Sequence, residues 1–586
     1  MIVIDYLFLV NKSSKESLYQ KKWFYLGTDY KKIKVLQNSF LKADGYVDVF
    51  HELKSIQEEY KQEFIDFIGS LSVKYDSFQW WASSVSEKGM FEGQPLFMEF
   101  CYFKLIKQYM NQDVLIVLDN LTLLEAVQQN YNVKTYIYQK SSYIAEIIGY
   151  FKSRAKFFIM HFFRKKAPDC YISGKKYIGL ISWVDDRNTE SGDFEDSYFG
   201  KLFSSKKNND EFLYLPNFIF RKYKDEAFAA LRKESINYFS LFDNFTKLDV
   251  LKALFLSMGF NFDKNEKFIF DGENVSLFIK QKLKDDWLAN RLSKYYLLYF
   301  AVKCLKQKGV FLDKVVYLFE NQPWEKILCY SFKEFYPEVE LIGFMHSVTL
   351  PYLLSLYPSQ NEREIMPQPD KIFTTGQLFS EELRKYYDKT KIEDACAFRY
   401  EYCFENKVIS KNKKNVILVA LASDVEKKAE MIDKIYYAYK DKKEYRVLIK
   451  DHPANPANLE SIFNNELPDN FEIVNQPISE LLSSSSLVIN ADSTVGFEAL
   501  KFRVPVIEIL FNVNSNMSPI DYFQGKKYKC LTPNEILDTT NTILNMPHDE
   551  KNKYFLEVDS FLESCFNPIK DEYIAKICNK RQKEYF

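Results

Sequence analysis

Two strand-like runs in the last third of the chain end in clusters of polar residues. The run Tyr445–Ile449 leads into Lys450 and His452, and the run Leu487–Asn490 leads into the segment Ala-Asp-Ser-Thr-Val-Gly. Ligands of open α/β sheets bind at the carboxyl ends of the strands. The second run is followed by a predicted helix, whose free N–H groups suit a phosphate. This pattern predicts an α/β sheet that binds a phosphorylated, nucleotide-bearing molecule.

The rest of the chain also alternates short β-branched runs with amphipathic helical stretches, which indicates an α/β fold. A length of 586 residues is too great for one core, so we expect two or three domains. The predicted boundary lies between an N-terminal part, 1–400, and a C-terminal part, 401–586. Helical stretches are expected at Glu52–Ile68, Leu121–Gln129, 221–258 and 275–307. The predicted strands are Ile2–Val10, Ile33–Leu36, Val114–Leu118, Lys134–Tyr138, Tyr177–Trp183, Val315–Phe319, Val339–Phe344, Lys371–Thr374, Val416–Ala420, Tyr445–Ile449, Phe471–Val474, Leu487–Asn490 and Val504–Ile509.

Charge and cysteine usage restrict the class of protein. With 79 basic and 80 acidic residues the net charge is −1, which argues against a protein that binds nucleic acid through overall positive charge. Nine dispersed cysteines without a C-x-x-C pair suit reduced thiols rather than disulfides or a zinc site. The N-terminus has no signal-peptide pattern, and no apolar run reaches the length of a membrane span. The sequence therefore predicts a cytoplasmic protein.

The segment 142–166 is strongly apolar with interleaved cations, and Glu146 is its only acid. Such a segment can lie in a membrane interface with its basic residues against anionic head groups. A helical hairpin that packs on its domain explains the same composition. Both interpretations stay open at this point.

The C-terminal strand ends supply six candidate ligand-binding residues. His452 precedes a proline that fixes the turn, and its plain alternative is a structural turn histidine. A hydroxyl pair at the next strand end suits a phosphate, although the same residues make an ordinary helix N-cap. The glycine that follows leaves room for a ligand, and the carboxylate in the first helical turn could accept ribose hydroxyls. The six residues are Lys450, His452, Ser493, Thr494, Gly496 and Glu498.

Earlier strand ends supply candidate acids and a second histidine. The run Val315–Phe319 leads into Glu320 and a tryptophan. These side chains suit a carbohydrate-binding site and equally a solvated loop that a buried tryptophan anchors. An Asp–Asp pair after Tyr177–Trp183 suggests a metal, a general base or a solvated turn, and the sequence leaves these alternatives open. The candidates are Asp185, Asp186, Asp193, Asp196, Glu320 and His346.

The pairing of Lys450-Asp-His-Pro453 with Asp492-Ser-Thr-Val-Gly-Phe-Glu498 resembles the C-terminal domain of GT-B glycosyltransferases. The resemblance is to capsule and lipopolysaccharide enzymes that use CMP-activated ulosonic acids, the Kdo transferases and bacterial sialyltransferases. It is specific over roughly the last third of the chain and architectural elsewhere. It implies two Rossmann-like domains that face a cleft, with a helical insertion in the N-terminal half.

The resemblance also implies roles for these residues. His452 would contact the donor phosphate, Ser493 and Thr494 would bind the phosphate or a sugar carboxylate, and Glu498 would hold the ribose. No metal or other cofactor is implied, and the catalytic base would be an acid of the N-terminal half. A motif for the base of the donor nucleotide is not evident, so CMP, UDP, GDP and CDP stay open.

The leading hypothesis is therefore an inverting, metal-independent glycosyltransferase. Its partners would be a nucleotide-sugar donor, a surface glycan or lipid-linked acceptor, and the anionic inner face of the cytoplasmic membrane, reached through the segment 142–166. A polyol-phosphate transferase of the teichoic-acid type is an alternative, because it would use histidines on both lobes, here His346 and His452. A non-catalytic protein that binds sugar nucleotides or glycans is a third.

Overall fold

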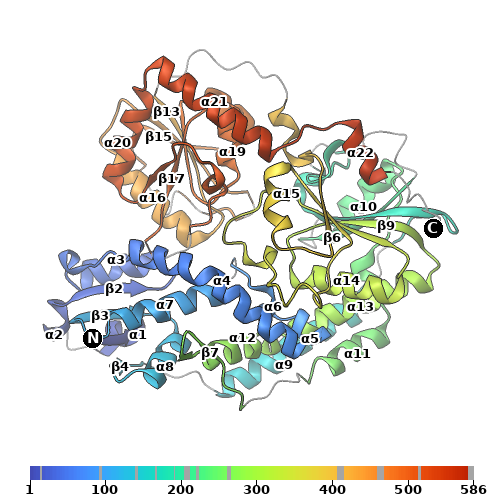
Figure 1. Ribbon diagram of the computed structural model, residues 1–586, viewed down its shortest axis with the longest axis horizontal. Coiled ribbons are helices and arrows are strands. Elements are labelled where there is room, and N and C mark those ends of the chain that lie inside the picture. The colour runs from blue at the N-terminus through green and yellow to red at the C-terminus, as the bar shows by residue number, and fades with distance from the viewer. Residues whose placement is uncertain are drawn as a thin grey trace.

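The computed structural model describes residues 1–12, 16–90, 95–138, 143–164, 168–189, 192–202, 211–219, 224–259, 265–404, 415–453, 455–457, 459, 467–512 and 516–578. Within these residues the chain forms three parallel β-sheets with helices packed on them (Figure 1). Two of the sheets have six strands each and are Rossmann-like. The predicted α/β class with two Rossmann-like parallel sheets is confirmed.

The first part of the chain forms a third, smaller sheet, which the sequence did not separate from the rest. Its four strands run parallel in the order β2-β3-β1-β4. In Figure 1 this N-terminal domain lies at the lower left. Its strands are β1 (Ile2–Asp5), β2 (Lys22–Leu26), β3 (Val114–Leu118) and β4 (Lys134–Tyr136). Its helices are α1 (Tyr6–Lys12), α2 (Glu16–Tyr19), α3 (Tyr30–Ser39), α4 (Phe50–Tyr75), α5 (Phe78–Trp81), α6 (Ser84–Glu87), α7 (Leu96–Gln108) and α8 (Leu121–Asn130).

The predicted strand Ile33–Leu36 is wrong, because this segment is part of helix α3. Asp29 caps that helix by accepting a hydrogen bond from the backbone N–H of Lys31 at 3.0 Å. Ile33 and Leu36, three residues apart, bury the same helical face. The strand of this region is the aromatic run β2, which precedes the helix.

The central sheet has the order β12-β11-β10-β9-β5-β6. Its strands are β5 (Lys176–Val184), β6 (Phe212–Phe218), β9 (Phe311–Leu318), β10 (Glu340–Phe344), β11 (Lys371–Thr374) and β12 (Lys391–Asp394). Around it lie α9 (Tyr143–Phe162), α10 (Lys224–Lys233), α11 (Lys247–Leu256), α12 (Ser276–Leu288), α13 (Arg291–Gln307), α14 (Pro323–Phe335), α15 (Gln377–Arg384) and the short hairpin β7 (Ile269–Phe270) and β8 (Glu273–Asn274). Helices α10 to α13 lie within the predicted helical region 221–307. Residues 221–223 and 260–264 of that region lie outside the described residues.

The C-terminal sheet has the order β15-β14-β13-β16-β17-β18. Its strands are β13 (Val416–Ala420), β14 (Arg446–Lys450), β15 (Phe471–Val474), β16 (Leu487–Asn490), β17 (Val506–Ile509) and β18 (Tyr528–Cys530). Its helices are α16 (Val425–Tyr439), α18 (Ile478–Ser484), α19 (Val495–Lys501), α20 (Pro533–Leu544) and α21 (His548–Cys565). All five predicted strands are found within two residues of their predicted ends, and the apolar runs of β16 and β17 are buried on both faces.

Two crossings connect the central and C-terminal domains. The first is the 3₁₀ segment η7 (Phe398–Cys403), which contains the predicted boundary at 400. The second is the chain after α21, where Asn567 pairs with the backbone of Thr375 and Ala397 at 2.7 and 3.0 Å. The last helix, α22 (Asp571–Cys578), then packs on the central domain and buries Ile577 there. The division at 400/401 stays a prediction.

The described residues of the segment 142–166 form one helix, α9, rather than a hairpin, and residues 142, 165 and 166 lie outside the described residues. One side of α9 packs on the domain through Phe157, which is buried. None of the described helices is both long enough and apolar enough to cross a membrane.

Candidate functional site

The carboxyl ends of the central and C-terminal sheets meet around Arg399, in the segment η7 that joins them. The Arg399 guanidinium lies 5.6 Å from the ring centre of Tyr198 and 5.9 Å from that of Tyr400. Burial raises the pKa of Glu320 on the central side and of Glu498 on the C-terminal side, and the charge of Arg399 opposes both rises. Among the residues that the structure describes, Arg399 has no ion pair or hydrogen bond. We call this region the junction, and Arg399 is its unpaired cation.

On the central side, the turn after β9 holds Glu320 in place. The backbone N–H groups of Glu320 and Asn321 both donate to the carboxylate of Glu325, at 2.9 and 2.8 Å. Asn321 has a φ of +57°, a left-handed conformation that asparagine adopts more readily than most residues. The buried Glu325 is therefore a structural ligand of the turn.

The Glu320 carboxyl group is the titratable group best placed for proton transfer. Gln322 Nε2 donates to one of its oxygens at 2.6 Å, and the other oxygen lies 3.6 Å from His346 Nε2. Burial raises the pKa of Glu320 to about 7, against the opposing effects of Gln322 and Arg399. Near neutral pH this carboxyl group can both take up and release a proton.

Trp324 supports this turn from behind. Its Nε1 donates to Gln322 Oε1 at 3.1 Å, and its ring packs against Tyr317 and Phe242 in the core of the domain. Trp324 therefore anchors the loop, and carbohydrate binding at this strand end stays a prediction.

His346, after β10, is enclosed by aromatic rings. Its ring centre lies 5.1 Å from that of Trp183 and 4.9 Å from that of Tyr198, and only 3% of the residue is exposed. Burial and then the charge of Arg399 hold its pKa well below the usual histidine value. Its Nδ1 has no hydrogen-bond partner among the described residues. His346 is therefore a neutral imidazole beside Glu320.

The structure does not bring the candidate aspartates together. Asp185 is buried and accepts from Arg187 Nε at 3.0 Å within its own loop. Asp196 is sealed and accepts from the backbone of Tyr198 at 2.8 Å and from the Tyr214 hydroxyl at 2.7 Å. Asp193 is exposed and forms an ion pair with Lys233. Asp186 begins a 3₁₀ turn, and its side chain lies outside the described residues.

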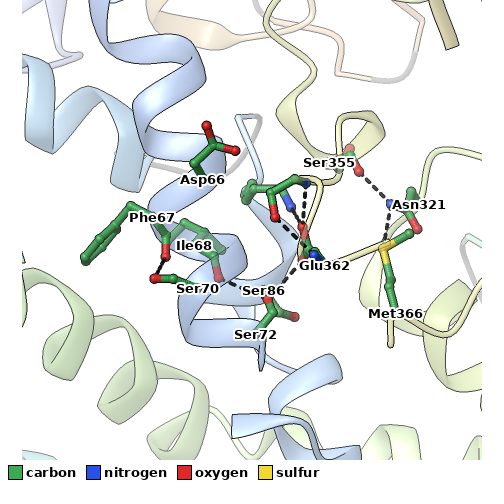
Figure 2. A network of polar contacts seen from close by, with 12 residues as sticks. Asp66, Phe67, Ile68, Ser70, Ser72, Ser86, Asn321, Ser355, Glu362 and Met366 are labelled. Carbon is green, nitrogen blue, oxygen red and sulfur yellow. Dashed lines mark hydrogen bonds and ion pairs between the residues drawn. The ribbon is translucent and has the colours of Figure 1, made fainter. Parts of the chain in front are cut away.

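A buried polar network lies behind Glu320 (Figure 2). Ser355 Oγ donates to the Glu320 carbonyl at 2.9 Å, and Asn321 Nδ2 donates to the Ser355 carbonyl at 2.7 Å. The polypeptide continues from Ser355 to Glu362, which is fully buried and lies against helix α4. Ser72 Oγ of α4 is 3.0 Å from Glu362 Oε1.

Two buried lysines complete this network. Lys88 forms an ion pair with Glu362 at 2.6 Å, and Lys326 donates to the Ser86 carbonyl at 2.7 Å. Although burial opposes it, the charges of Lys88 and Lys326 hold the pKa of Glu362 below its usual value. Gly69 allows the close approach, because a Cβ there would lie 1.8 Å from Ser359 Oγ. The central side of the junction is thus supported by the N-terminal domain.

On the C-terminal side, Asp451 fixes the turn that carries His452. Its carboxylate accepts from the backbone of His452 at 2.7 Å and of Ala457 at 2.6 Å, and it pairs with the buried Lys428. Burial, followed by the charges of Lys428 and Arg399, lowers the pKa of His452. Arg187 of the central domain lowers it as well, which places His452 at the junction. Near pH 7 its ring is neutral and can donate one N–H hydrogen bond.

Lys450, the last residue of β14, turns toward the next strand. Its Nζ donates to the Asn475 carbonyl at 3.4 Å, and burial lowers its pKa. The structure therefore places Lys450 beside the β15 end of the sheet.

The turn after β16 presents the two hydroxyl residues. Asp492 has a φ of +48° and pairs with Lys427. Ser493 Oγ accepts from the Val495 N–H at 3.3 Å, whereas Thr494 occupies the N-cap position without a side-chain capping bond. Helix α19 has only seven residues, so the contribution of its dipole is small.

Gly496 and Glu498 lie in the first turns of α19. A Cβ at Gly496 would lie 2.8 Å from Ile520 Cδ1, so this glycine permits close packing rather than the approach of a ligand. Glu498 accepts a hydrogen bond from the Tyr402 hydroxyl. Burial raises the pKa of Glu498 to about 7, and Arg399 opposes that shift.

Arg399 and the aromatic residues around it were not among the site residues predicted from the sequence. Arg399 and Tyr400 lie in a charged, irregular run between two sheets, so they do not stand at a strand end. Trp183 and Tyr198 look like core residues in the sequence. The only available signal was an arginine between aromatic residues in the segment that joins the two domains.

Comparisons with known proteins identify similar folds. No family model matches the sequence, and no curated protein matches it. The glycosyltransferase SnogD from Streptomyces nogalater has a TM-score of 0.40 at 12% identity, over 69% of this chain and 99% of that chain. CalG4, the calicheamicin glycosyltransferase, has 0.40 at 10% identity, over 67% and 96%. The Methanocaldococcus jannaschii UDP-GlcNAc 2-epimerase, in complex with UDP-GlcNAc and UDP, has 0.36 at 9% identity, over 66% and 99%.

Proposed function

We propose that this chain is an inverting glycosyltransferase that uses a nucleotide-linked sugar and needs no metal ion. One observation carries the proposal: a carboxyl group with a pKa of about 7, Glu320, and an unpaired cation, Arg399, lie where two Rossmann-like sheets meet. A base and an anion site are the two components that transfer from a nucleotide donor requires. The motif residues His452, Ser493 and Thr494 lie on the C-terminal side of the same junction.

Glu320 is the proposed catalytic base. Its carboxylate takes the proton of an acceptor hydroxyl while that oxygen bonds to the anomeric carbon of the donor. The bond from the anomeric carbon to the phosphate oxygen breaks, and the nucleotide leaves with the electron pair. Among the six acidic and histidine candidates of the N-terminal half, Asp185, Asp193 and Asp196 already have partners, and His346 is enclosed.

Arg399 and His452 would stabilise the leaving nucleotide. Arg399 supplies a permanent charge, and His452 supplies a neutral N–H donor. Ser493 and Thr494 would add hydroxyl donors, and Glu498 would accept from the ribose. A guanidinium group binds a phosphate or a carboxylate equally well, which fits a CMP-linked ulosonic acid as the donor.

The acceptor in this proposal is a surface polysaccharide or a lipid-linked glycan. A polyol-phosphate transferase would use His346 and His452 as a pair at the phosphate. The 3% exposure of His346 and its contacts with Trp183 and Tyr198 favour the glycosyltransferase instead.

A nucleotide panel tests the proposal. Thermal-shift assays with CMP, CDP, UDP and GDP identify the base, and hydrolysis of the matching sugar donor then measures turnover, with and without EDTA. We expect one nucleotide to stabilise the protein, His452→Ala to reduce donor hydrolysis by about 100-fold or more, and EDTA to change nothing. No response to any nucleotide would reject the proposal. Binding without turnover in any assay would identify a non-catalytic binding protein, and transfer from a polyol-phosphate donor would identify the alternative enzyme.

A further inference from the structure

Helices α9 and α11 expose a large apolar surface away from the junction. The outward stripe of α9 contains Ile144, Ile148, Phe151 and Ile159, at helical spacing. Phe151 is 65% exposed, and none of these four side chains is buried by another part of the described chain. A soluble helix does not normally expose such a stripe.

Helix α11 extends this surface. It contacts α9, and both helices lie along the lower edge of the molecule in Figure 1. Its exposed residues include Leu248, Leu251 and Phe255, the last of which is 72% exposed. The two helices therefore form one surface, which we call the α9–α11 face.

A groove adjoins the α11 part of this face. Its volume is about 640 Å³, and its walls come from α5, α11, α13 and α14. Leu251 and Phe255 line it together with Tyr296 and Tyr330. The groove adds an apolar recess beside the exposed stripe.

The charges on the α9–α11 face are mainly positive. Five exposed lysines lie on its helices or line the groove, and none has an ion pair among the described residues: Lys152, Lys156, Lys247, Lys252 and Lys303. The acids of the two helices already have partners. Glu146 pairs with Lys284 at 2.7 Å, and Asp249 caps α11 by accepting from Thr246.

The arginine of α9 belongs to the packed side of the helix. The Arg154 guanidinium stacks on Tyr150 at 3.4 Å, and its Nη2 donates to the Trp287 carbonyl at 3.1 Å. The exposed charge of α9 therefore comes from Lys152 and Lys156.

We propose that the α9–α11 face docks on an anionic lipid surface, with its apolar stripe in the interface and its lysines against the head groups. Charge complementarity selects this partner, because unpaired lysines beside exposed aromatic and branched side chains are what an anionic bilayer binds. The surface alone carries this proposal, which holds whether or not the chain is a glycosyltransferase.

Vesicle co-sedimentation of the full chain tests the proposal. We expect binding to phosphatidylcholine vesicles that contain about 30% phosphatidylglycerol, weakened by salt, and little binding to pure phosphatidylcholine. Phe151→Ser with Phe255→Ser should reduce the partition coefficient at least tenfold. Lys152→Gln with Lys156→Gln should reduce it about fivefold for each lysine removed.

Matched controls lie on α21 of the C-terminal domain. Leu556, which is 67% exposed, is changed to Ser, and Lys551 and Lys553 are changed to Gln. Both controls should bind vesicles like the parent, and hydrogen exchange should slow in 143–162 and 247–256 when vesicles are added.

Three outcomes would overturn the proposal. The parent protein could fail to bind anionic vesicles, or the α9–α11 variants could bind as well as the parent. Third, the parent protein could be a dimer that the Phe151→Ser, Phe255→Ser variant makes monomeric, while neither protein binds vesicles. That result would assign the face to a second copy of the chain.

Discussion

The two sides of the junction differ in what their side chains can do. The central side carries a carboxyl group with a pKa of about 7, Glu320, beside a neutral, enclosed histidine. The C-terminal side carries hydrogen-bond donors on short turns, with a neutral His452 and the hydroxyls of Ser493 and Thr494. In the proposed mechanism, proton transfer and anion binding are thus divided between two domains, and the charge of Arg399 acts on both.

Their supports differ as well. The C-terminal turns are fixed by ion pairs within their own domain, Asp451 with Lys428 and Asp492 with Lys427. The central turn is held by Glu325 and by a buried network that reaches helix α4 of the N-terminal domain (Figure 2). The proposed base therefore depends on a domain that is separate from both large sheets.

The largest expected effect breaks the chemistry of the central side alone. Glu320→Gln keeps the size and polarity of the side chain but cannot accept a proton, so we expect kcat for sugar transfer to fall about 100-fold to 10,000-fold. Donor affinity should change little, because the C-terminal side is intact. Steady-state kinetics and donor titration separate the two quantities.

The pH dependence sharpens this prediction. A base must be deprotonated, so the activity of the parent should rise as the pH rises through about 7, and the Glu320→Gln variant should lose that limb. Asp193→Asn is the matched control, because Asp193 is exposed and forms an ion pair with Lys233. If Asp193→Asn removed the limb and Glu320→Gln kept it, the assignment of the base would be wrong.

The second prediction concerns the support of the central side. Glu362→Gln leaves Lys88 and Lys326 buried without their carboxylate, so we expect a loss of about 3–5 kcal/mol in the free energy of unfolding. Trp80, whose Nε1 donates to Ser72 at 2.9 Å, is a nearby fluorescent reporter for denaturant unfolding. The exposed pair Lys54–Glu58 gives the control, since Glu58→Gln should cost less than about 0.5 kcal/mol.

The same variant tests the link to function. Under conditions where it stays folded, Glu362→Gln should lower kcat more than it weakens donor binding, because the network holds the Glu320 turn. Equal losses in kcat and in donor affinity would show that the N-terminal domain supports both sides of the junction.

The third prediction removes the group that both sides share. Arg399→Ala should weaken donor binding about tenfold to 100-fold, the value of a hydrogen bond to a charged group. It should also move the rise in activity to higher pH, because Arg399 now lowers the pKa of Glu320 and its loss would let that pKa rise. Arg399→Lys should restore the pH at which activity rises more fully than it restores donor affinity. An unchanged limb in Arg399→Ala would place the guanidinium outside the junction.

The sequence predicted the C-terminal side better than the central side, for a physical reason. Strands such as β13 and β16 are buried on both faces and read as continuous apolar runs, so their polar ends are easy to find. On the central side, Glu320 was one of six candidates, because its neighbours His346 and Ser355 come from separate segments. The edge strand β12 was missed because lysines and acids interrupt its apolar pattern. The aromatic strand β2 was missed because the β-branched residues of that region lie in the neighbouring helix α3.

The helix α9 shows the same limit. Its composition was compatible with a membrane surface and with a packed helix. The structure packs one side of the helix on the domain and leaves the other side exposed. Which cations are exposed depends on Tyr150 and Trp287, which engage Arg154, and no pattern in the segment indicates that pairing.

The smallest expected effect lies in the C-terminal turn itself. Thr494→Val removes a hydroxyl that makes no capping bond to α19, so the helix should lose no support while the donor loses one neutral hydrogen bond. Such a bond is worth about 0.5–1.5 kcal/mol, which predicts a rise of about twofold to tenfold in the donor Kd with kcat nearly unchanged. Ser493→Ala makes a useful contrast, because Ser493 Oγ accepts from the Val495 N–H and its loss should also lower the melting temperature. A Thr494→Val variant with the donor affinity of the parent would remove Thr494 from the binding site and leave the C-terminal side with His452 and Arg399 as its anion ligands.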